Sequence, residues 1–408
     1  MEGKKIQATS ELHQTRRSSY SNLNTITVPF PKALRSSFIH FTMSNPQATI
    51  PKGSWVLVTG ATGNVATQVA KQFLERGYKV RGTVRDLAKA SWLVTDVFKT
   101  QADRGDFELI VVPDLAADHA FDDAVKGVSA IAHVASVVTF SPDPSEVVPQ
   151  TVKGATGILE AALNEPSVRE FVYTSSIVAA TLVVPGNTTH VDENTYNETA
   201  IELAWSKAAP EALRGAIVYS ASKAEAEKAV WEFVRQRKPH FTVNAVGPSH
   251  ILGEQLHRSN LQSNGAWLKM LVDGDLSDLQ NYTTCKIPIP LDTYDEPWSD
   301  TCTVFNIDVK DVGLLHVAAV LDGEVKNKRL QAWAQGCTWN DILAILRELY
   351  PDRKFIDDLP GQERPGVTSD FTLQMELLKK WGNQEGWRTL EQTIEDNMKS
   401  ILELEAKA

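Results

Sequence analysis

The feature that most constrains the fold is a glycine-rich turn between an apolar strand and an amphipathic helix. Residues 55–60 read WVLVTG, residues 64–77 read NVATQVAKQFLERG, and residues 78–84 read YKVRGTV. A continuous apolar run is typical of a strand whose two faces are both covered by helices, and Gly77 stands where helices commonly end. The segment therefore predicts a strand, a helix and a second, parallel strand.

The alternation of strands and helices continues to about residue 250. Further buried strands are expected at 107–112, 128–134, 170–174 and 241–246. The intervening helices are expected at 116–126, 147–164 and 219–237. Strict alternation of this kind predicts an α/β fold built on a doubly wound parallel sheet, the Rossmann arrangement.

Beyond Gly247 the pattern becomes mixed, with a loop-rich stretch at 257–300 and helical stretches at 339–349 and 371–381. This change predicts a smaller C-terminal substrate-binding lobe. We expect a nucleotide-binding Rossmann domain over 51–250, and a region over 251–408 that forms mainly the lobe and is interleaved with that domain.

Residues 1–50 differ in composition from the rest of the chain. Ser, Thr and Asn are frequent there and basic residues outnumber acidic ones, which predicts a poorly ordered N-terminal extension. The basic, Ser-rich character of residues 1–42 is also compatible with a mitochondrial presequence. Otherwise we expect a cytoplasmic protein.

The overall composition excludes several classes of function. The chain has 408 residues and a net charge of −10, and it lacks a long run of bases, so nucleic acid is not an expected partner. No run of about 18 apolar residues is present to span a membrane. Its three cysteines have no CxxC spacing and no His/Asp/Glu cluster has metal-ligand spacing, so no metal is expected.

The glycine turn has the spacing G-x-x-G-x-x-A, from Gly60 through Gly63 to Ala66. Glycine is needed where the backbone approaches a pyrophosphate, and the following helix offers free N–H groups and the positive end of its dipole. We therefore expect the turn to bind a dinucleotide. The residues expected to contact it are Gly60, Thr62, Gly63, Asn64 and Val65.

The end of the second strand distinguishes the two nicotinamide cofactors. Arg85 stands there, and an arginine accommodates the 2′-phosphate of NADP, whereas an acid bonds the ribose hydroxyls of NAD. Lys89 adds a second positive charge. The adjacent Asp86 leaves NAD open, but the two bases favour NADPH. After the third strand, Asp114 and Leu115 are placed to border the adenine.

The pattern Tyr-x-x-x-Lys occurs three times, in different settings. Two matches lack a helical context, because one lies in YTTCKIPIP and the other contains a proline: Tyr282 with Lys286, and Tyr350 with Lys354. The third, Tyr219 with Lys223, lies in a helical pattern, so the two side chains share one face a single turn apart.

The strand at 170–174 ends in two serines, at the sheet edge where ligands bind in doubly wound folds. Ser176, or alternatively Ser175, would hydrogen-bond a substrate carbonyl oxygen. Tyr219 would exchange the proton, and Lys223 would supply the cation that stabilises its phenolate and would bond the nicotinamide ribose. These residues predict reduction of a carbonyl compound by hydride and proton transfer.

The sequence resembles the extended short-chain dehydrogenases, in the branch that holds dihydroflavonol reductases and fungal and yeast NADPH-dependent aldehyde reductases. The likeness covers about residues 53–388, and its segments include GSWVLVTGATGNVA, GYKVRGTVRD, IAHVASVV, VREFVYTSS, VYSASKAEAE and KPHFTVNAVGP. It implies NADPH as cofactor and an aldehyde or ketone as substrate. It also implies that the nicotinamide is flanked by Val134, Ala135, Ser136, Pro248 and Ser249.

Two other functions fit the same fold: an NAD-dependent nucleotide-sugar epimerase or dehydratase, and a non-enzymatic NADP-sensing regulator. His133 is expected to be a core histidine and His250 has no assigned role. Phe140 and Trp267 are candidates for an apolar substrate wall. The oligomeric state, monomer or homodimer, is not determined by the sequence.

Overall fold

The computed structural model describes residues 48–139, 141–184, 186–206, 208–209, 211–262, 264–274, 304–359 and 361–406, without the side chains of 212 and 262–267. These residues belong to one compact unit that runs from Asn45 to Ala408. The expectations for residues 1–47, including the presequence over 1–42, lie outside the described residues and stay predictions.

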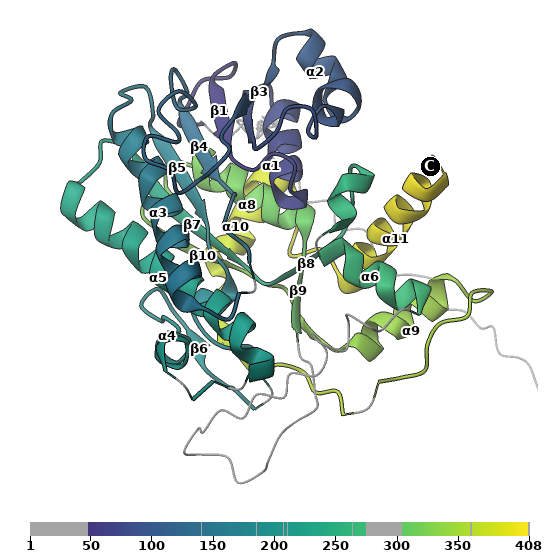
Figure 1. Cartoon of the computed structure of the whole chain (residues 1–408). Coiled ribbons are helices and arrows are strands. Elements are labelled where there is room, and N and C mark those ends of the chain that lie inside the picture. Colours follow the sequence, from purple (N-terminus) through teal and green to yellow (C-terminus); the bar gives the residue numbers. More distant parts are fainter. Residues whose placement is uncertain are drawn as a thin grey trace, which may run out of the picture. The chain divides into compact units, whose positions relative to one another are not determined.

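Seven parallel strands form the central sheet, in the order β10-β7-β5-β4-β1-β2-β3 (Figure 1). The direction in which the chain adds strands reverses between β1 and β4, which is the switch point of a doubly wound fold. The predicted α/β fold is confirmed. The strands are β1 (Trp55–Val58), β2 (Lys79–Val84), β3 (Phe107–Val111), β4 (Ala130–His133), β5 (Glu170–Thr174), β7 (Thr242–Pro248) and β10 (Arg329–Ala332).

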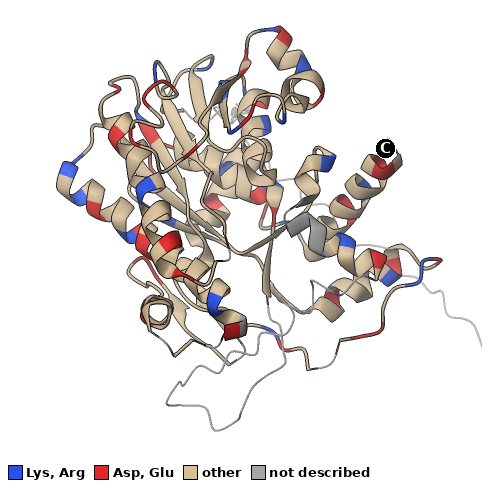
Figure 2. Ribbon diagram, viewed as in Figure 1, with Lys and Arg blue, Asp and Glu red and all other residues tan. Residues whose placement is uncertain are grey.

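Helices cover both faces of this sheet (Figure 1). One face packs against α3 (Pro144–Leu163) and α5 (Arg214–Arg237), with α4 (Glu198–Trp205) beside α5. The other packs against α1 (Asn64–Glu75), α8 (Val309–Leu321) and α10 (Thr372–Gly382). Figure 2 shows Lys, Arg, Asp and Glu interspersed along the outer helices while most of the sheet carries none, as expected for strands buried on both faces.

The C-terminal lobe has its own apolar core. It forms between α6 (Asn264–Asp273), α9 (Trp339–Leu349) and α11 (Leu390–Ala406), where Trp339, Ile342 and Met398 are buried. The remaining elements are short: α2 (Lys99–Asp103), a three-stranded sheet of β8 (His250–Leu252), β9 (Val304–Asp308) and β11 (Gly336–Cys337), and the pair β6 (His190–Val191) with β12 (Thr368–Ser369). Among the described helices, none has the length and apolarity to cross a membrane.

The predicted helix at 116–126 is wrong, because the chain makes successive turns there. Asp114 accepts a hydrogen bond from the backbone N–H of Ala116, and His119 adopts a left-handed backbone (φ 61°) that interrupts a helix. The predicted helix at 219–237 is correct but too short, since α5 begins at Arg214. Tyr219 therefore lies in the second turn of the helix rather than at its start.

Asn244 ties three elements together in the fully buried part of the sheet. Its side-chain amide donates to the carbonyls of Ala319 (2.8 Å) and Val325 (3.0 Å), and its oxygen accepts the N–H of Lys328 (2.9 Å). These bonds fix the end of α8 and the start of β10 against β7. The C-terminal part of the chain is thereby joined to the central sheet.

We expect Asn244→Ala to lower the free energy of unfolding by about 2–4 kcal/mol, because it leaves two buried carbonyls and one partly buried N–H group without this partner. Urea denaturation followed by circular dichroism measures the loss. Asn194→Ala at an exposed position is the control and should change the value by less than about 0.5 kcal/mol. Equal stability of the two variants would contradict the assigned role.

Candidate active site

A cleft of about 640 Å³ lies at the carboxyl ends of the parallel strands. The proposed catalytic residues Ser176, Tyr219 and Lys223 line it, and so does every expected cofactor-binding residue except Lys89. The expected cofactor-binding residues among its walls are Gly60, Thr62, Gly63, Asn64, Val65, Arg85, Asp114, Leu115, Val134, Ala135, Ser136, Pro248 and Ser249. Residues far apart in the sequence thus share one cavity.

The glycine turn packs its backbone closely against the residues that follow β4. Gly60 has a left-handed backbone (φ 68°), and a Cβ atom there would lie 3.0 Å from Cβ of Ala135. Gly63 is the N-cap residue of α1 and has no side chain to bond the first N–H groups of the helix. Those N–H groups can therefore bond a ligand. These features fit the pyrophosphate of a dinucleotide.

The end of β2 presents two bases toward the solvent. Arg85 and Lys89 are exposed, and Lys89 lines an adjoining hollow of about 420 Å³ together with Trp92 and Asn260. The carboxylate of Asp86 accepts hydrogen bonds from the backbone N–H groups of Ala88 (2.8 Å) and Lys89 (3.2 Å). These bonds engage the carboxylate with the backbone that follows it, so it is less free to bond the ribose hydroxyls of NAD. The structure therefore favours a phosphorylated ribose at this position.

The end of β4 is fixed by a hydroxyl from β1. Thr59 Oγ1 accepts the N–H of Ala135 (2.9 Å) and is hydrogen-bonded to Nδ1 of His133 (3.0 Å). Burial lowers the pKa of His133 to about 3, with a smaller contribution from Lys223, so the imidazole is neutral at physiological pH. His133 is therefore a core residue, as expected, and it helps to hold Val134–Ser136 at the cleft.

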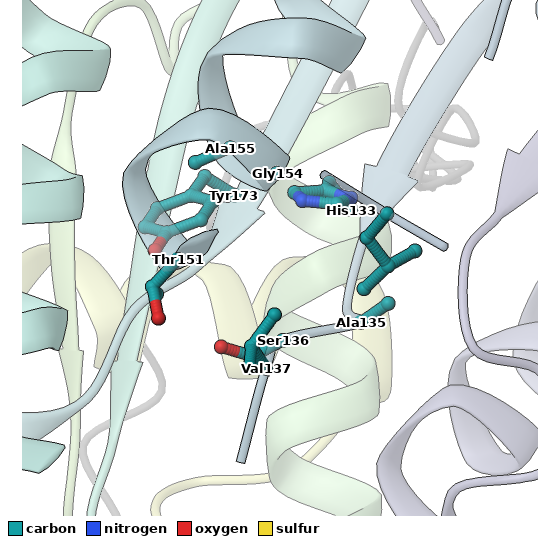
Figure 3. A pocket seen from close by; sticks show the side chains of 9 residues that line it. His133, Ala135, Ser136, Val137, Thr151, Gly154, Ala155 and Tyr173 are labelled. Atoms are coloured by element: carbon teal, nitrogen blue, oxygen red, sulfur yellow. The ribbon is translucent and has the colours of Figure 1, made fainter. Parts of the chain in front are cut away.

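A second, much smaller cavity of about 10 Å³ lies behind the cleft (Figure 3). Its walls include His133, Tyr173 and Thr151, and it borders the cleft at Ser136 and Val137. The hydroxyl of Tyr173 is buried and has no hydrogen-bond partner among the described residues. A space of this size holds one water molecule, which would satisfy that hydroxyl.

The three residues at the end of β5 point in different directions. Thr174 Oγ1 is hydrogen-bonded to Nε2 of His316 in α8 (2.7 Å), whereas Ser175 Oγ donates to Glu227 in α5 (2.7 Å). Successive side chains of an extended strand alternate between the two faces of the sheet. The Ser175 hydroxyl is thus held by α5, and Ser176, which caps the short turn Ile177–Ala179, is the serine next to Tyr219.

Tyr219 and Lys223 lie on consecutive turns of α5. Tyr219 is hydrogen-bonded to Ser176; burial raises the pKa of its phenol and this bond opposes the rise. Lys223 is buried, and its Nζ donates to the carbonyl of Thr174 (3.4 Å). Burial lowers the pKa of Lys223 to about 8, against the opposing effect of the Glu227 carboxylate. The arrangement places a phenol, a hydroxyl and an ammonium side by side.

The sequence did not reveal several residues that shape the site. Thr83 Oγ1 accepts the N–H of Gly60 (3.0 Å), and Asn260 donates to the carbonyl of Thr62 (2.9 Å) from the C-terminal lobe. Single polar residues of this kind carry no local sequence signal. Glu227 did have a local sequence signal, because it follows Lys223 by one turn on the face of α5 that carries Tyr219 and Lys223.

Other expected residues lie as follows. Ser249 borders the cleft, but its hydroxyl donates to the carbonyl of Phe305 (2.6 Å). His250 is buried in an edge-on contact with Trp339. Tyr350 caps the end of α9 in the lobe. Phe140, the side chain of Trp267, and the pair Tyr282 and Lys286 lie outside the described residues.

Comparison with known proteins identifies the relationship. The sequence pattern of the 3-beta hydroxysteroid dehydrogenase/isomerase family matches residues 57–262. Aldehyde reductase 2 of Sporidiobolus salmonicolor is 36% identical over 351 residues, which cover 86% of this chain and 96% of that protein. The chain belongs to the 3-beta hydroxysteroid dehydrogenase/isomerase family of extended short-chain dehydrogenases. The resemblance deduced from the sequence is confirmed.

Two further relatives differ in what their names state. A protein of Aspergillus terreus (strain NIH 2624 / FGSC A1156) named NAD-dependent epimerase/dehydratase terH is 36% identical over 366 residues, covering 88% of this chain and 99% of that protein. The crystal structure of yeast methylglyoxal/isovaleraldehyde reductase Gre2 complexed with NADPH superposes with a TM-score of 0.67 and 25% identity. It covers 87% of this family member and 100% of the yeast chain.

We expect Arg85→Ala to raise the dissociation constant of NADPH about 10- to 100-fold while leaving that of NADH unchanged, because only NADPH carries the 2′-phosphate. Isothermal titration calorimetry measures both constants. Arg104→Ala, at an exposed arginine after α2, is the control. A parallel loss of affinity for both cofactors would instead indicate that Arg85 does not contact the 2′-phosphate.

Proposed function

We propose that this protein reduces an aldehyde or ketone to an alcohol with NADPH, with Tyr219 as the proton donor. The observation that carries the proposal is the Ser176–Tyr219 hydrogen bond beside buried Lys223, in a cleft that begins at the glycine turn. The family membership and the reductase names among the relatives support it.

The cofactor is held by the walls described above. The glycine turn and the start of α1 receive the pyrophosphate, Arg85 and Lys89 the 2′-phosphate, and Asp114 and Leu115 border the adenine. Val134–Ser136, Pro248 and Ser249 would flank the nicotinamide, and Lys223 would hydrogen-bond its ribose. NADPH supplies the hydride that reduces the carbonyl carbon.

The chain's own residues handle the carbonyl oxygen. Ser176 donates a hydrogen bond to that oxygen and holds it within reach of the Tyr219 hydroxyl. Tyr219 then transfers its proton to the oxygen as negative charge develops there. A phenol buried in this way resists ionisation, and the adjacent ammonium of Lys223 stabilises the phenolate that remains.

An NAD-dependent epimerase or dehydratase is the second candidate, because relatives such as terH carry that name. Such enzymes retain NAD and regenerate it within one cycle. The exposed Arg85 and the engaged carboxylate of Asp86 favour NADPH instead. Tightly bound NAD in the purified protein would support the epimerase. Turnover of NADPH with a carbonyl compound supports the reductase and also argues against a regulator without catalysis.

The compartment and the assembly are part of the proposal. We propose a cytoplasmic enzyme, with mitochondrial import as the outcome if residues 1–42 act as a presequence, and a monomer or homodimer. The partner is a small carbonyl compound rather than nucleic acid. Its identity and the stereochemistry of its reduction depend largely on the lobe.

We expect Tyr219→Phe to lower kcat for carbonyl reduction about 10²- to 10⁴-fold, because the proton donor is removed while the ring is retained. NADPH oxidation at 340 nm with a panel of aldehydes and ketones measures the rate. Tyr350→Phe, in a Tyr-x-x-x-Lys match outside the cleft, is the matched control and should retain full activity. Full activity of Tyr219→Phe would refute the assignment.

We expect kcat/KM for reduction to fall as the pH rises through about 8, since Lys223 is charged below its pKa of about 8 and loses its charge above it. A pH–rate profile that extends about two units to each side of this pKa measures the limb. Lys223→Arg keeps a cation throughout the range, so its profile should lack the limb near pH 8. An identical limb in both proteins would assign it to another group.

A further inference from the structure

A buried ion pair lies directly behind the proposed catalytic residues. Glu227 follows Lys223 by one turn of α5, and its carboxylate receives Nε (2.6 Å) and Nη2 (3.1 Å) of Arg329 from β10. The side chains of Arg329 and Glu227 are 5% and 3% exposed. Ser175 Oγ and the indole N–H of Trp231 (3.2 Å) complete the donors to this carboxylate. A charge buried this deeply is stable only with such partners.

Arg329 connects this carboxylate to the loop before α4. Its Nη1 donates to the carbonyls of Glu193 (3.0 Å) and Thr195 (2.9 Å), and its guanidinium stacks 4.3 Å from the ring centre of Tyr196. At the end of the same loop, the Asn197 amide donates to the carbonyl of Val178 (2.8 Å). Val178 lies in the short turn that Ser176 caps. The ion pair is thus linked to both sides of the reacting centre.

The Glu227 carboxylate also holds the hydroxyl of one of the two adjacent serines. Because it accepts the hydroxyl of Ser175, the strand end is held with Ser175 turned toward α5. Ser176 is then the serine beside Tyr219. The sequence alone does not show which of the two adjacent serines lies beside Tyr219.

Among the described residues, Glu227 is the negative charge that acts on the pKa of Lys223. Tyr219 and Glu227 face it from α5, the ring of Tyr173 lies 6.0 Å from its Nζ on β5, and His133 couples to it from β4. The imidazole is neutral and burial raises the pKa of the Tyr173 phenol, so neither carries charge near neutral pH. Burial and Glu227 act on the pKa of Lys223 in opposite directions.

We propose that Glu227 is a positioning residue for the reduction: it keeps the Lys223 ammonium charged and holds Ser175 so that Ser176 faces the substrate. Arg329 holds the Glu227 carboxylate in place through two hydrogen bonds. The proposal rests on the function proposed above, because it assigns Glu227 a task in the same site. It does not require contact between Glu227 and substrate or cofactor.

The experiment measures the pKa of Lys223 directly, by NMR titration of protein labelled with ¹³C at the lysine Cε atoms. Lys223→Met, in which one resonance is missing, assigns the signal. We expect the pKa of Lys223 to fall by about one unit or more in Glu227→Gln, where Arg329 is left as an unopposed positive charge. In the double variant Glu227→Gln/Arg329→Gln, the pKa of Lys223 should lie between its value in the single variant Glu227→Gln and its value in the wild type.

The double variant also keeps the test valid if Glu227→Gln does not fold, because it removes the buried Arg329 charge that the single substitution leaves without a partner. Glu225→Gln on the same helix is the matched control; its carboxylate accepts the indole N–H of Trp205 at the surface, and it should not change the pKa of Lys223. In the folded variants the alkaline limb of the pH–rate profile should move to lower pH by the same amount as the NMR titration.

An unchanged pKa of Lys223 in a folded Glu227 variant would overturn the proposal, even if the variant were slower or less stable. A purely structural role for the ion pair would give that result. If the wild-type protein reduced no carbonyl compound, the proposed function would fail. The NMR titration would still report whether Glu227 controls the charge of Lys223, so the two failures are distinguishable.

Discussion

The close approach of the Gly60 backbone to Ala135 is the contact on which the site depends. At the switch point of the sheet, the residues that follow β1 and β4 can approach this closely only because Gly60 has no side chain and accepts a left-handed backbone. Thr59 and Thr83 then hold the two sides of the turn through single hydroxyls. A dinucleotide can therefore extend from the glycine turn toward the end of β5.

Burial gives the catalytic groups their properties. The ammonium of Lys223 and the carboxylate of Glu227 lie in the interior, where interactions between charges are much stronger than in water. The phenol of Tyr219, half-buried beside them, stays protonated and available as a donor, while the lysine remains close to its charged form. The same low polarity would make each of these charges costly without its partner, which explains why Arg329 from a distant strand completes the set.

Much of the fold could be predicted from sequence because its signals are local. Apolar runs marked the strands, the glycine spacing marked the first turn, and the periodicity at 339–349 matches α9 at both ends. The helix expected at 116–126 failed because Asp114 closes a turn with its own backbone, and hydrogen bonds of this kind compete with helix formation. The short β10 was missed because four residues in a loop-rich context give no periodicity.

The sequence by itself determined the alternation of strands and helices, the cofactor turn and the residue types of the reaction, since each depends on neighbours within a few positions. Only the tertiary structure decided between Ser175 and Ser176, because the choice depends on a carboxylate 52 residues away from Ser175. It alone brought Arg329 to Glu227, 102 positions apart, and Asn260 to Thr62, 198 positions apart. Contacts between residues this far apart in the sequence depend on how the strands pair and the helices pack, so no local sequence pattern predicts them.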